Sequence, residues 1–199
     1  MGGGLRDRQR APSRRLMLIL ASASPQRRRL LRKAGMRFKI VPSGVGENCR
    51  ERNPRRLVAL LARRKALAVA KRRPGDVVLG ADTLVVCRGR IIGKPRNRAH
   101  ARRILMLLNG SWQRVYTGVA VAARGGKRVR SAVVVSRVKA RRLSEGELAR
   151  YAGKHLDKAG AYAVQDHGDP FIERIEGPVD NVIGLPVEAA KELIAKLTR

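Results

Sequence analysis

The stretch that decides the fold is residues 77–95, which read VVLGADTLVVCRGRIIGKP. Its first half is a near-continuous apolar run, typical of a strand that is buried on both faces of a sheet. Arg88 and Gly89 then predict a turn, after which residues 90–92 return as a second strand to a corner at residues 93–95. The stretch therefore predicts a hairpin at the centre of the fold.

Asp82 lies in the middle of this apolar run. An ionised carboxylate is costly there unless a cation pairs with it, a metal binds it or a reaction uses it. The hairpin brings Lys94 back towards it, so the stretch indicates a phosphate or metal-phosphate site. The alternative is a buried ion pair within the hairpin, and a short motif alone leaves both interpretations open.

Length and composition predict a globular protein. The chain has 199 residues, 44% of them hydrophobic, which is enough for one large domain or two small lobes with a proper core. The apolar run at residues 16–21 is too short to cross a bilayer. Cys49 and Cys87 are isolated, and the histidines are not at metal-ligand spacing. We therefore expect a reducing cytoplasm and no structural zinc.

The formal net charge of +30 has two explanations. A basic surface binds nucleic acid or attracts polyanionic substrates. Alternatively, the charge reflects an arginine-biased genome, since the chain has 34 arginines and only 11 lysines. The arginines occur in every segment, aromatic residues make up only 3%, and no nucleic-acid-binding signature is present. The charge predicts non-specific affinity for polyanions, and a basic nucleic-acid-binding protein without catalytic activity is the alternative function.

The order of the remaining elements predicts a mixed α/β domain at residues 16–199. Residues 1–15 hold glycines, charges and a proline, so we expect a flexible tail, and Met17 is a second candidate for the start of the chain. Further strands are expected at 16–21, 37–42, 115–123, 128–138 and 171–176, with loop and strand in 153–165. Helices are expected at 25–35, 54–73, 98–108, 145–152 and 186–197.

The segment 22–29, SASPQRRR, is a turn that leads from the first strand into a helix. Ser24 suits the N-cap and Pro25 the first helical position. A helix N-terminus favours an anion by about 0.3–1 kcal/mol, so the arginines in the first turn oppose the dipole unless a phosphate neutralises them. The turn therefore predicts a bound anion, with a solvated basic face as the alternative.

Two further charged residues stand in unusual places. Glu47 ends a glycine-rich loop at residues 43–47, which by itself indicates only a loop. Lys65 falls within the apolar face of the helix at 54–73. Such a lysine either has a buried function or extends its ammonium to the rim of the core.

Taken together, these blocks resemble the Maf family of nucleoside triphosphate pyrophosphatases. The resemblance is carried, in order from Met17 to the end, by LILASASPQRRRLLRKAG, the Glu47 loop, the Lys65 helix, GADTLVVCRGRIIGKP, LNG…VYTGVAV and DKAGAYAVQ…FIERIEGPVDNVIGLP. It implies an elongated α/β protein with two lobes around a nucleotide cleft, usually a cytoplasmic homodimer. The implied reaction converts a nucleoside triphosphate to the monophosphate and pyrophosphate with a divalent metal, and clearing non-standard nucleotides is an implied role.

The resemblance also implies roles for individual residues. Asp82 is the proton acceptor, with Glu47 as its acidic companion at the metal. Lys65, Lys94, Ser22 and Arg27 are the implied phosphate ligands. Oxygen ligands of this kind suit magnesium or manganese. The chain has neither a Walker loop nor a dinucleotide fingerprint, so kinase, GTPase and dehydrogenase functions lose their usual support.

Gln26, Thr83 and Gln165 match positions that are associated with the choice of base. Thr83 and Gln165 agree with family members that act on dTTP and UTP, whereas Gln26 replaces the arginine that is usual there. The glycines before Glu47 also replace a more acidic stretch. A neutral amide presents either a donor or an acceptor to a base, so we expect Gln26 to widen the choice of substrate.

Overall fold

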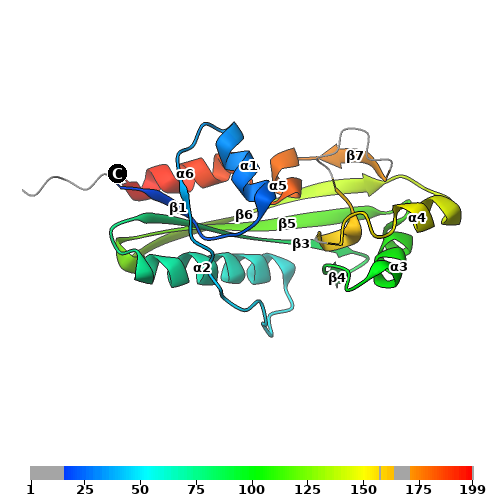
Figure 1. Ribbon diagram of the computed structural model, residues 1–199, viewed down its shortest axis with the longest axis horizontal. Coiled ribbons are helices and arrows are strands. Elements are labelled where there is room, and N and C mark those ends of the chain that lie inside the picture. Colours follow the sequence, from blue (N-terminus) through cyan, green and yellow to red (C-terminus); the bar gives the residue numbers. More distant parts are fainter. Residues whose placement is uncertain (1–15, 157, 164–170, 199) are drawn as a thin grey trace, which may run out of the picture.

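The computed structural model describes residues 16–198 except 157 and 164–170, and these form an elongated α/β structure (Figure 1). The strands are β1 (Leu18–Leu20), β2 (Lys39–Ile40), β3 (Val77–Cys87), β4 (Arg90–Ile92), β5 (Trp112–Ala123), β6 (Arg128–Ala140) and β7 (Ile172–Glu176). The helices are α1 (Pro25–Lys33), α2 (Pro54–Arg72), α3 (Arg98–Leu108), α4 (Glu145–Tyr151), α5 (Val179–Ile183) and α6 (Val187–Thr198), with 3₁₀ turns η1 (Arg124–Gly126) and η2 (Ala159–Ala161). Within the described residues, the strands form one mixed sheet of order β2-β1-β3-β5-β6-β7, and β4 also pairs with β3.

Strand β3 organises this sheet. One of its edges pairs along most of its length with the antiparallel strand β5. The other edge is shared, because parallel β1 ends where Leu20 lies beside Leu79, and antiparallel β4 begins only where Ile92 lies beside Val85. The edge between these two positions has no strand partner in the described structure. A gap therefore opens at the carboxyl end of β1, the place where ligands bind in many α/β sheets.

The two faces of β3 are covered by different helices. Leu79 and Ala81 pack with residues of α1 and α6 in one core cluster, whereas Val78 packs with residues of α2 in another. Figure 1 shows α2 on one side of the long strands and α1, α5 and α6 on the other. Because side chains alternate along a strand, Asp82 faces α2 and its neighbour Thr83 faces α1 and α5.

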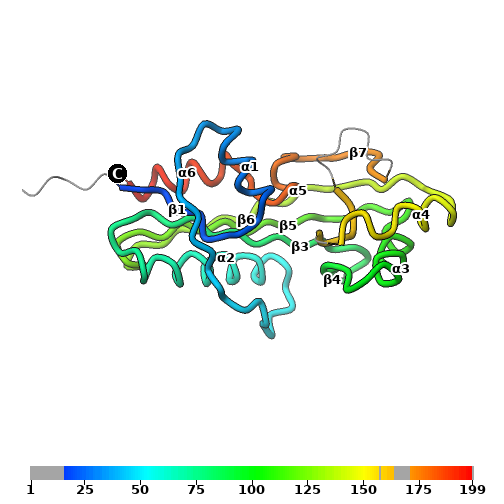
Figure 2. The backbone as a smooth tube through the Cα atoms, in the orientation of Figure 1, coloured from blue at the N-terminus to red at the C-terminus, as the bar shows by residue number. Residues whose placement is uncertain are grey.

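A third core cluster lies at the other end of the long strands. There α3, α4, β4, β7 and η2 pack around buried residues that include Leu105, Tyr162 and Phe171. The backbone in Figure 2 shows β3, β5 and β6 running through both ends of the molecule. The predicted two-lobed α/β arrangement is thus built on shared strands, and the gap beside β3 lies between the lobes.

Most predicted elements are confirmed, including the hairpin turn at Arg88 and Gly89, both of which have positive φ. Strand β2 is shorter than the predicted 37–42. The strand expected within 153–165 is wrong for the described residues 153–156 and 158–163, which contain η2 instead. Helix α5 was not predicted, because its five residues are too few for a helical pattern. The tail at 1–15 lies outside the described residues.

Two glycines let α2 lie directly on the sheet. A Cβ at Gly118 would overlap the carbonyl of Val58, and one at Gly80 would lie 2.5 Å from the carbonyl oxygen of Ala62. Gly118 pairs with Asp82 across β3 and β5. The close approach of α2 is therefore what brings Lys65, on the same helix, within reach of Asp82.

We predict that Gly118→Ala destabilises the protein by about 1–3 kcal/mol or more, because a methyl group must push a helix backbone off the sheet. Urea unfolding measures the loss. The matched control is Gly146→Ala in α4, where nothing lies within 4 Å of the added Cβ. An unfolding free energy that stays unchanged in Gly118→Ala would contradict the close packing of α2.

Candidate active site

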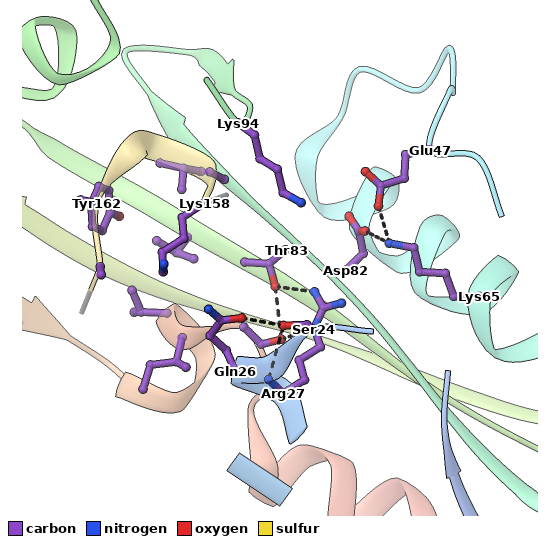
Figure 3. A pocket seen from close by; sticks show the side chains of 17 residues that line it. Ser24, Gln26, Arg27, Glu47, Lys65, Asp82, Thr83, Lys94, Lys158 and Tyr162 are labelled. Atoms are coloured by element: carbon purple, nitrogen blue, oxygen red, sulfur yellow. Dashed lines mark hydrogen bonds and ion pairs between the residues drawn. The ribbon is translucent and has the colours of Figure 1, made fainter. Parts of the chain in front are cut away.

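The ammonium of Lys65 bridges two carboxylates (Figure 3). Its Nζ lies 2.6 Å from Asp82 Oδ1 and 2.6 Å from Glu47 Oε1. Lys65 and Asp82 are buried, with exposures of 8% and 7%, whereas the side chain of Glu47 is 64% exposed. Lys65 therefore has a buried ion pair and does not extend to the rim. The hairpin lysine Lys94, which the sequence placed beside Asp82, points into the same space without replacing this pair.

The two carboxyl groups respond to this environment in opposite ways. Burial raises the pKa of Asp82 above its usual value, and the nearby charges of Lys65 and Arg27 only partly oppose this. The hydrogen bond from Lys65 lowers the pKa of Glu47. Asp82 is thus the more basic carboxylate and Glu47 the one that stays ionised most readily, the kind of separation that divides acid–base roles in active sites.

Arg27 reaches the site from the opposite face of the sheet. Its Nε donates to the carbonyl of Gly184 at 2.9 Å, its Nη1 to Ser22 Oγ at 3.1 Å, and its Nη2 to Thr83 Oγ1 at 3.3 Å. Burial lowers the pKa of Arg27, while the carboxylates of Asp82 and Glu47 raise it. A guanidinium has more donors than these contacts use, so Arg27 keeps N–H groups for a phosphate oxygen. Arg27, in the first turn of α1, is therefore held by contacts within the protein. The sequence had predicted only a bound anion or solvent as the partner of the first-turn arginines.

A series of buried hydrogen bonds holds the segment that includes Gly184, whose carbonyl oxygen accepts from Arg27. Thr83 Oγ1 and Thr117 Oγ1 are 3.0 Å apart, and Thr117 Oγ1 donates to the carbonyl of Asn181 at 2.9 Å. Thr117 and Asn181 are both fully buried. This chain ties α5, and with it Gly184, to β3 and β5. Sequence reasoning missed Thr117 and Asn181, although they lie in the quoted blocks VYTGVAV and DNVIGLP.

A cleft of about 180 Å³ opens beside these groups. It is lined by all the predicted site residues that the structure describes except Ser22. Ser22 lines an adjoining hollow together with Arg27, Glu47, Lys65 and Lys94. Gln165 lies outside the described residues. The structure thus brings eight of the predicted residues to one place from the β1–α1 segment, the loop between β2 and α2, helix α2, strand β3 and the corner after β4.

The donors of the site suit a hard divalent cation in part. The described residues contain no group of three histidine, cysteine, aspartate or glutamate side chains that would hold a metal alone. Asp82 and Glu47 each direct one oxygen at Lys65, and both residues line the cleft. Two carboxylates together with phosphate oxygens are the ligands that magnesium usually takes. The site therefore fits a metal that is bound jointly with a phosphorylated ligand.

Comparison with known proteins shows the family of this chain. The sequence model of the family described as "Maf-like protein" matches residues 17–197. The chain belongs to the Maf-like family. It is 50% identical to the dTTP/UTP pyrophosphatase of Elusimicrobium minutum (strain Pei191), over 90% of this chain and 97% of that protein.

Other relatives carry the same name. The dTTP/UTP pyrophosphatase of Gloeobacter violaceus is 43% identical, over 92% of this chain and 96% of that protein. The one of Pelotomaculum thermopropionicum is 42% identical, with coverages of 90% and 95%. A solved nucleoside-triphosphatase / dITP/XTP pyrophosphatase from Mycobacterium abscessus also aligns, over 91% of this chain and 95% of that chain, but its 13% identity and TM-score of 0.44 carry no argument. No helix in the described part of this Maf-like protein is long and apolar enough to span a membrane.

We predict that Lys65→Met lowers the free energy of unfolding by about 3–5 kcal/mol near neutral pH, because it leaves Asp82 buried without its cation. The loss of the cation raises the pKa of Asp82 further. A carboxyl whose pKa is raised on folding contributes stability below its unfolded pKa and loses it as the pH rises through the folded value. The difference in unfolding free energy between the parent protein and Lys65→Met should therefore grow from pH 5 to pH 8, as measured by urea unfolding.

The control for this experiment is the double variant Lys65→Met/Asp82→Asn, which has no buried charge at the pair. It should recover much of the lost stability and show little of the added pH dependence. If Lys65→Met were as stable as the parent protein at pH 8, the ion pair would not be the reason that Lys65 is buried.

Proposed function

We propose that this protein is a nucleoside triphosphate pyrophosphatase that hydrolyses dTTP and UTP to the monophosphate and pyrophosphate. The observation that carries the proposal is the pair of carboxylates bridged by Lys65 in a cleft that also holds Arg27 and Lys94. The relatives match this chain over most of its length, and their names support dTTP and UTP as its substrates. We also propose that residues 16–199 act as one catalytic domain.

The residues of the cleft account for each part of this reaction. Arg27 and Lys94 bind the triphosphate oxygens and, with Lys65, offset their negative charge. Ser22 accepts hydrogen bonds from Arg27 and from the backbone N–H of Ser24, so its own hydroxyl hydrogen can be donated to a phosphate oxygen. Charge neutralisation of this kind is the main requirement for attack at phosphorus, since the triphosphate otherwise repels a nucleophile.

Asp82 is the proposed proton acceptor. A water molecule attacks the α-phosphorus, so a new P–O bond forms while the bond from the α-phosphorus to the bridging oxygen breaks, and pyrophosphate leaves. The proton of the water passes to the carboxylate oxygen of Asp82 that does not contact Lys65. The raised pKa of Asp82 suits this role, because a more basic carboxylate accepts a proton more readily at neutral pH.

Glu47 and Asp82 are the residues that would hold magnesium or manganese. A bound divalent cation supplies further charge neutralisation at the phosphate oxygens. The lowered pKa of Glu47 keeps it ionised for this task over a wide pH range. Thr83, Gln26 and Gln165 remain the proposed determinants of base choice. The homodimer, the cytoplasmic location and the affinity for nucleic acids stay predictions, and no contact among the described residues favours a nucleic-acid-binding protein over an enzyme.

The proposal predicts that the purified protein releases pyrophosphate from dTTP and UTP when magnesium or manganese is present, and that chelation abolishes the release. Incubation with a panel of nucleoside triphosphates, followed by separate assays for pyrophosphate and orthophosphate, measures this. Release of orthophosphate, or no turnover of any nucleotide, would overturn it. The nucleic-acid alternative would instead give tight binding to DNA or RNA that weakens steeply with salt.

Asp82→Asn should lower kcat about 10²–10⁴-fold while the protein stays folded, because Lys65 keeps its contact with Glu47. In the parent protein, kcat/KM should fall as the pH drops through a value above the usual aspartate range, since protonated Asp82 cannot accept the proton. Rates from pH 4.5 to 8.5 measure this limb. Glu192→Gln, on the exposed side of α6, is the control. Near-normal turnover of Asp82→Asn would transfer the role of proton acceptor to Glu47.

A further inference from the structure

The cleft continues beyond the charged groups to a wall that is lined by none of the predicted residues within the described part of the chain. This wall is formed by Lys158 and Tyr162, from the segment around η2, and by Val182 and Ile183 of α5. In Figure 3, Lys158 and Tyr162 lie on the opposite side of Thr83 from Glu47 and Lys65. We propose that Lys158 binds the base of the nucleotide and, together with Gln26, selects uracil and thymine through their carbonyl oxygens. This inference rests on the proposed function.

The distribution of charge sets the direction of the nucleotide. Lys65, Lys94 and the two carboxylates gather at one end of the cleft, and Arg27 adjoins them. The triphosphate belongs there, because the adjoining hollow shares Glu47, Lys65 and Lys94 with the cleft and adds Ser22. The base must then extend past Thr83 to the wall that carries Lys158. No other lysine or arginine among the described lining residues stands at that end.

The amide of Gln26 has a fixed direction. Ser24 Oγ donates to Gln26 Oε1 at 3.0 Å, and the same hydroxyl caps α1 by accepting the backbone N–H of Arg27. The oxygen of the amide is thus engaged with Ser24. Its NH₂ group points away from Ser24, on the side where Lys158 lies (Figure 3). In this arrangement Gln26 offers the cleft a donor, as the arginine usual at this position would.

Two donors that face one space select a partner with acceptors. A lysine ammonium has no acceptor atom, and neither does the NH₂ group of an amide. Uracil and thymine present carbonyl oxygens at both positions flanking N3, whereas cytosine replaces one of them with an amino group. An amino group placed against Lys158 or the Gln26 NH₂ group would set donor against donor, so no hydrogen bond could form there, which is how sites built for hydrogen bonding reject a substrate.

The backbone holds Lys158 in place. Gly160 and Ala161 both have positive φ, at 81° and 60°, a conformation that is strained for an alanine. The N–H of Gly160 donates at 3.3 Å to the carbonyl of Gly93, next to Lys94, and Tyr162 is buried against Phe171. Such strain persists only where the surroundings fix the backbone. The segment that carries Lys158 is therefore joined to the corner that carries Lys94, so the base and phosphate ends keep a constant separation.

The test compares UTP, dTTP and CTP as substrates of the parent protein, Lys158→Met, Lys158→Arg and the control Lys154→Met. Lys154 is exposed and lies outside the cleft. We expect Lys158→Met to lower the ratio of kcat/KM for UTP to that for CTP about tenfold, the size of one hydrogen bond to a charged group. Lys158→Arg should keep the ratio, because it also presents donors only, and Lys154→Met should not change it. Thermal unfolding checks each variant, and Lys158→Gln replaces Lys158→Met if the latter does not fold.

Binding of UMP and CMP, measured by calorimetry, gives a second readout that does not need turnover. If the parent protein released no pyrophosphate, the proposed function would fail, yet a loss of UMP preference in Lys158→Met would still support base recognition. An equal fall for all nucleotides in both assays would place Lys158 at the phosphates or the ribose and overturn the inference. Unchanged ratios would overturn it as well.

Discussion

The ion pair between Lys65 and Asp82 is the interaction on which the site depends. Neither charge is stable in the core without a partner, and Glu47 contacts the same ammonium. The pair forms only because α2 touches the sheet at two glycines, Gly80 and Gly118. Helix packing and electrostatics therefore constrain each other: a side chain at either glycine would separate the charges, and loss of the Lys65 ammonium would leave Asp82 buried without its cation.

The alternation of side chains along β3 explains how one short stretch serves two faces. Asp82 points to α2 and meets Lys65, while Thr83 points to the other layer and meets Arg27. Both reach one cleft because β1 ends and β4 has not yet begun at this part of the edge. A continuous sheet would separate the two layers here. The gap joins them, so acid–base and phosphate-binding groups from opposite layers converge on one ligand.

Much of this arrangement follows from local sequence signals. The caps at Ser24, Asn53 and Asn97 and the hairpin turn at Arg88 depend on neighbouring residues, so they could be predicted. The partner of Asp82 could not be chosen from the sequence alone, because that choice depends on which helix covers which face. The buried contacts of Thr117 and Asn181 were missed for the same reason. They join segments that are 64 residues apart, and no spacing rule reports such a contact.

Gln26 shows how far a substitution can be interpreted without its surroundings. From the residue type alone, a neutral amide in place of an arginine should widen the choice of base, because it can turn either end to the ligand. The hydroxyl of Ser24 removes that freedom by engaging the amide oxygen. What remains at the cleft is a donor without the positive charge. Lys158 supplies a charge at the same end. In the proposed role of Gln26 in base choice, the neighbour that fixes the amide therefore matters as much as Gln26 itself.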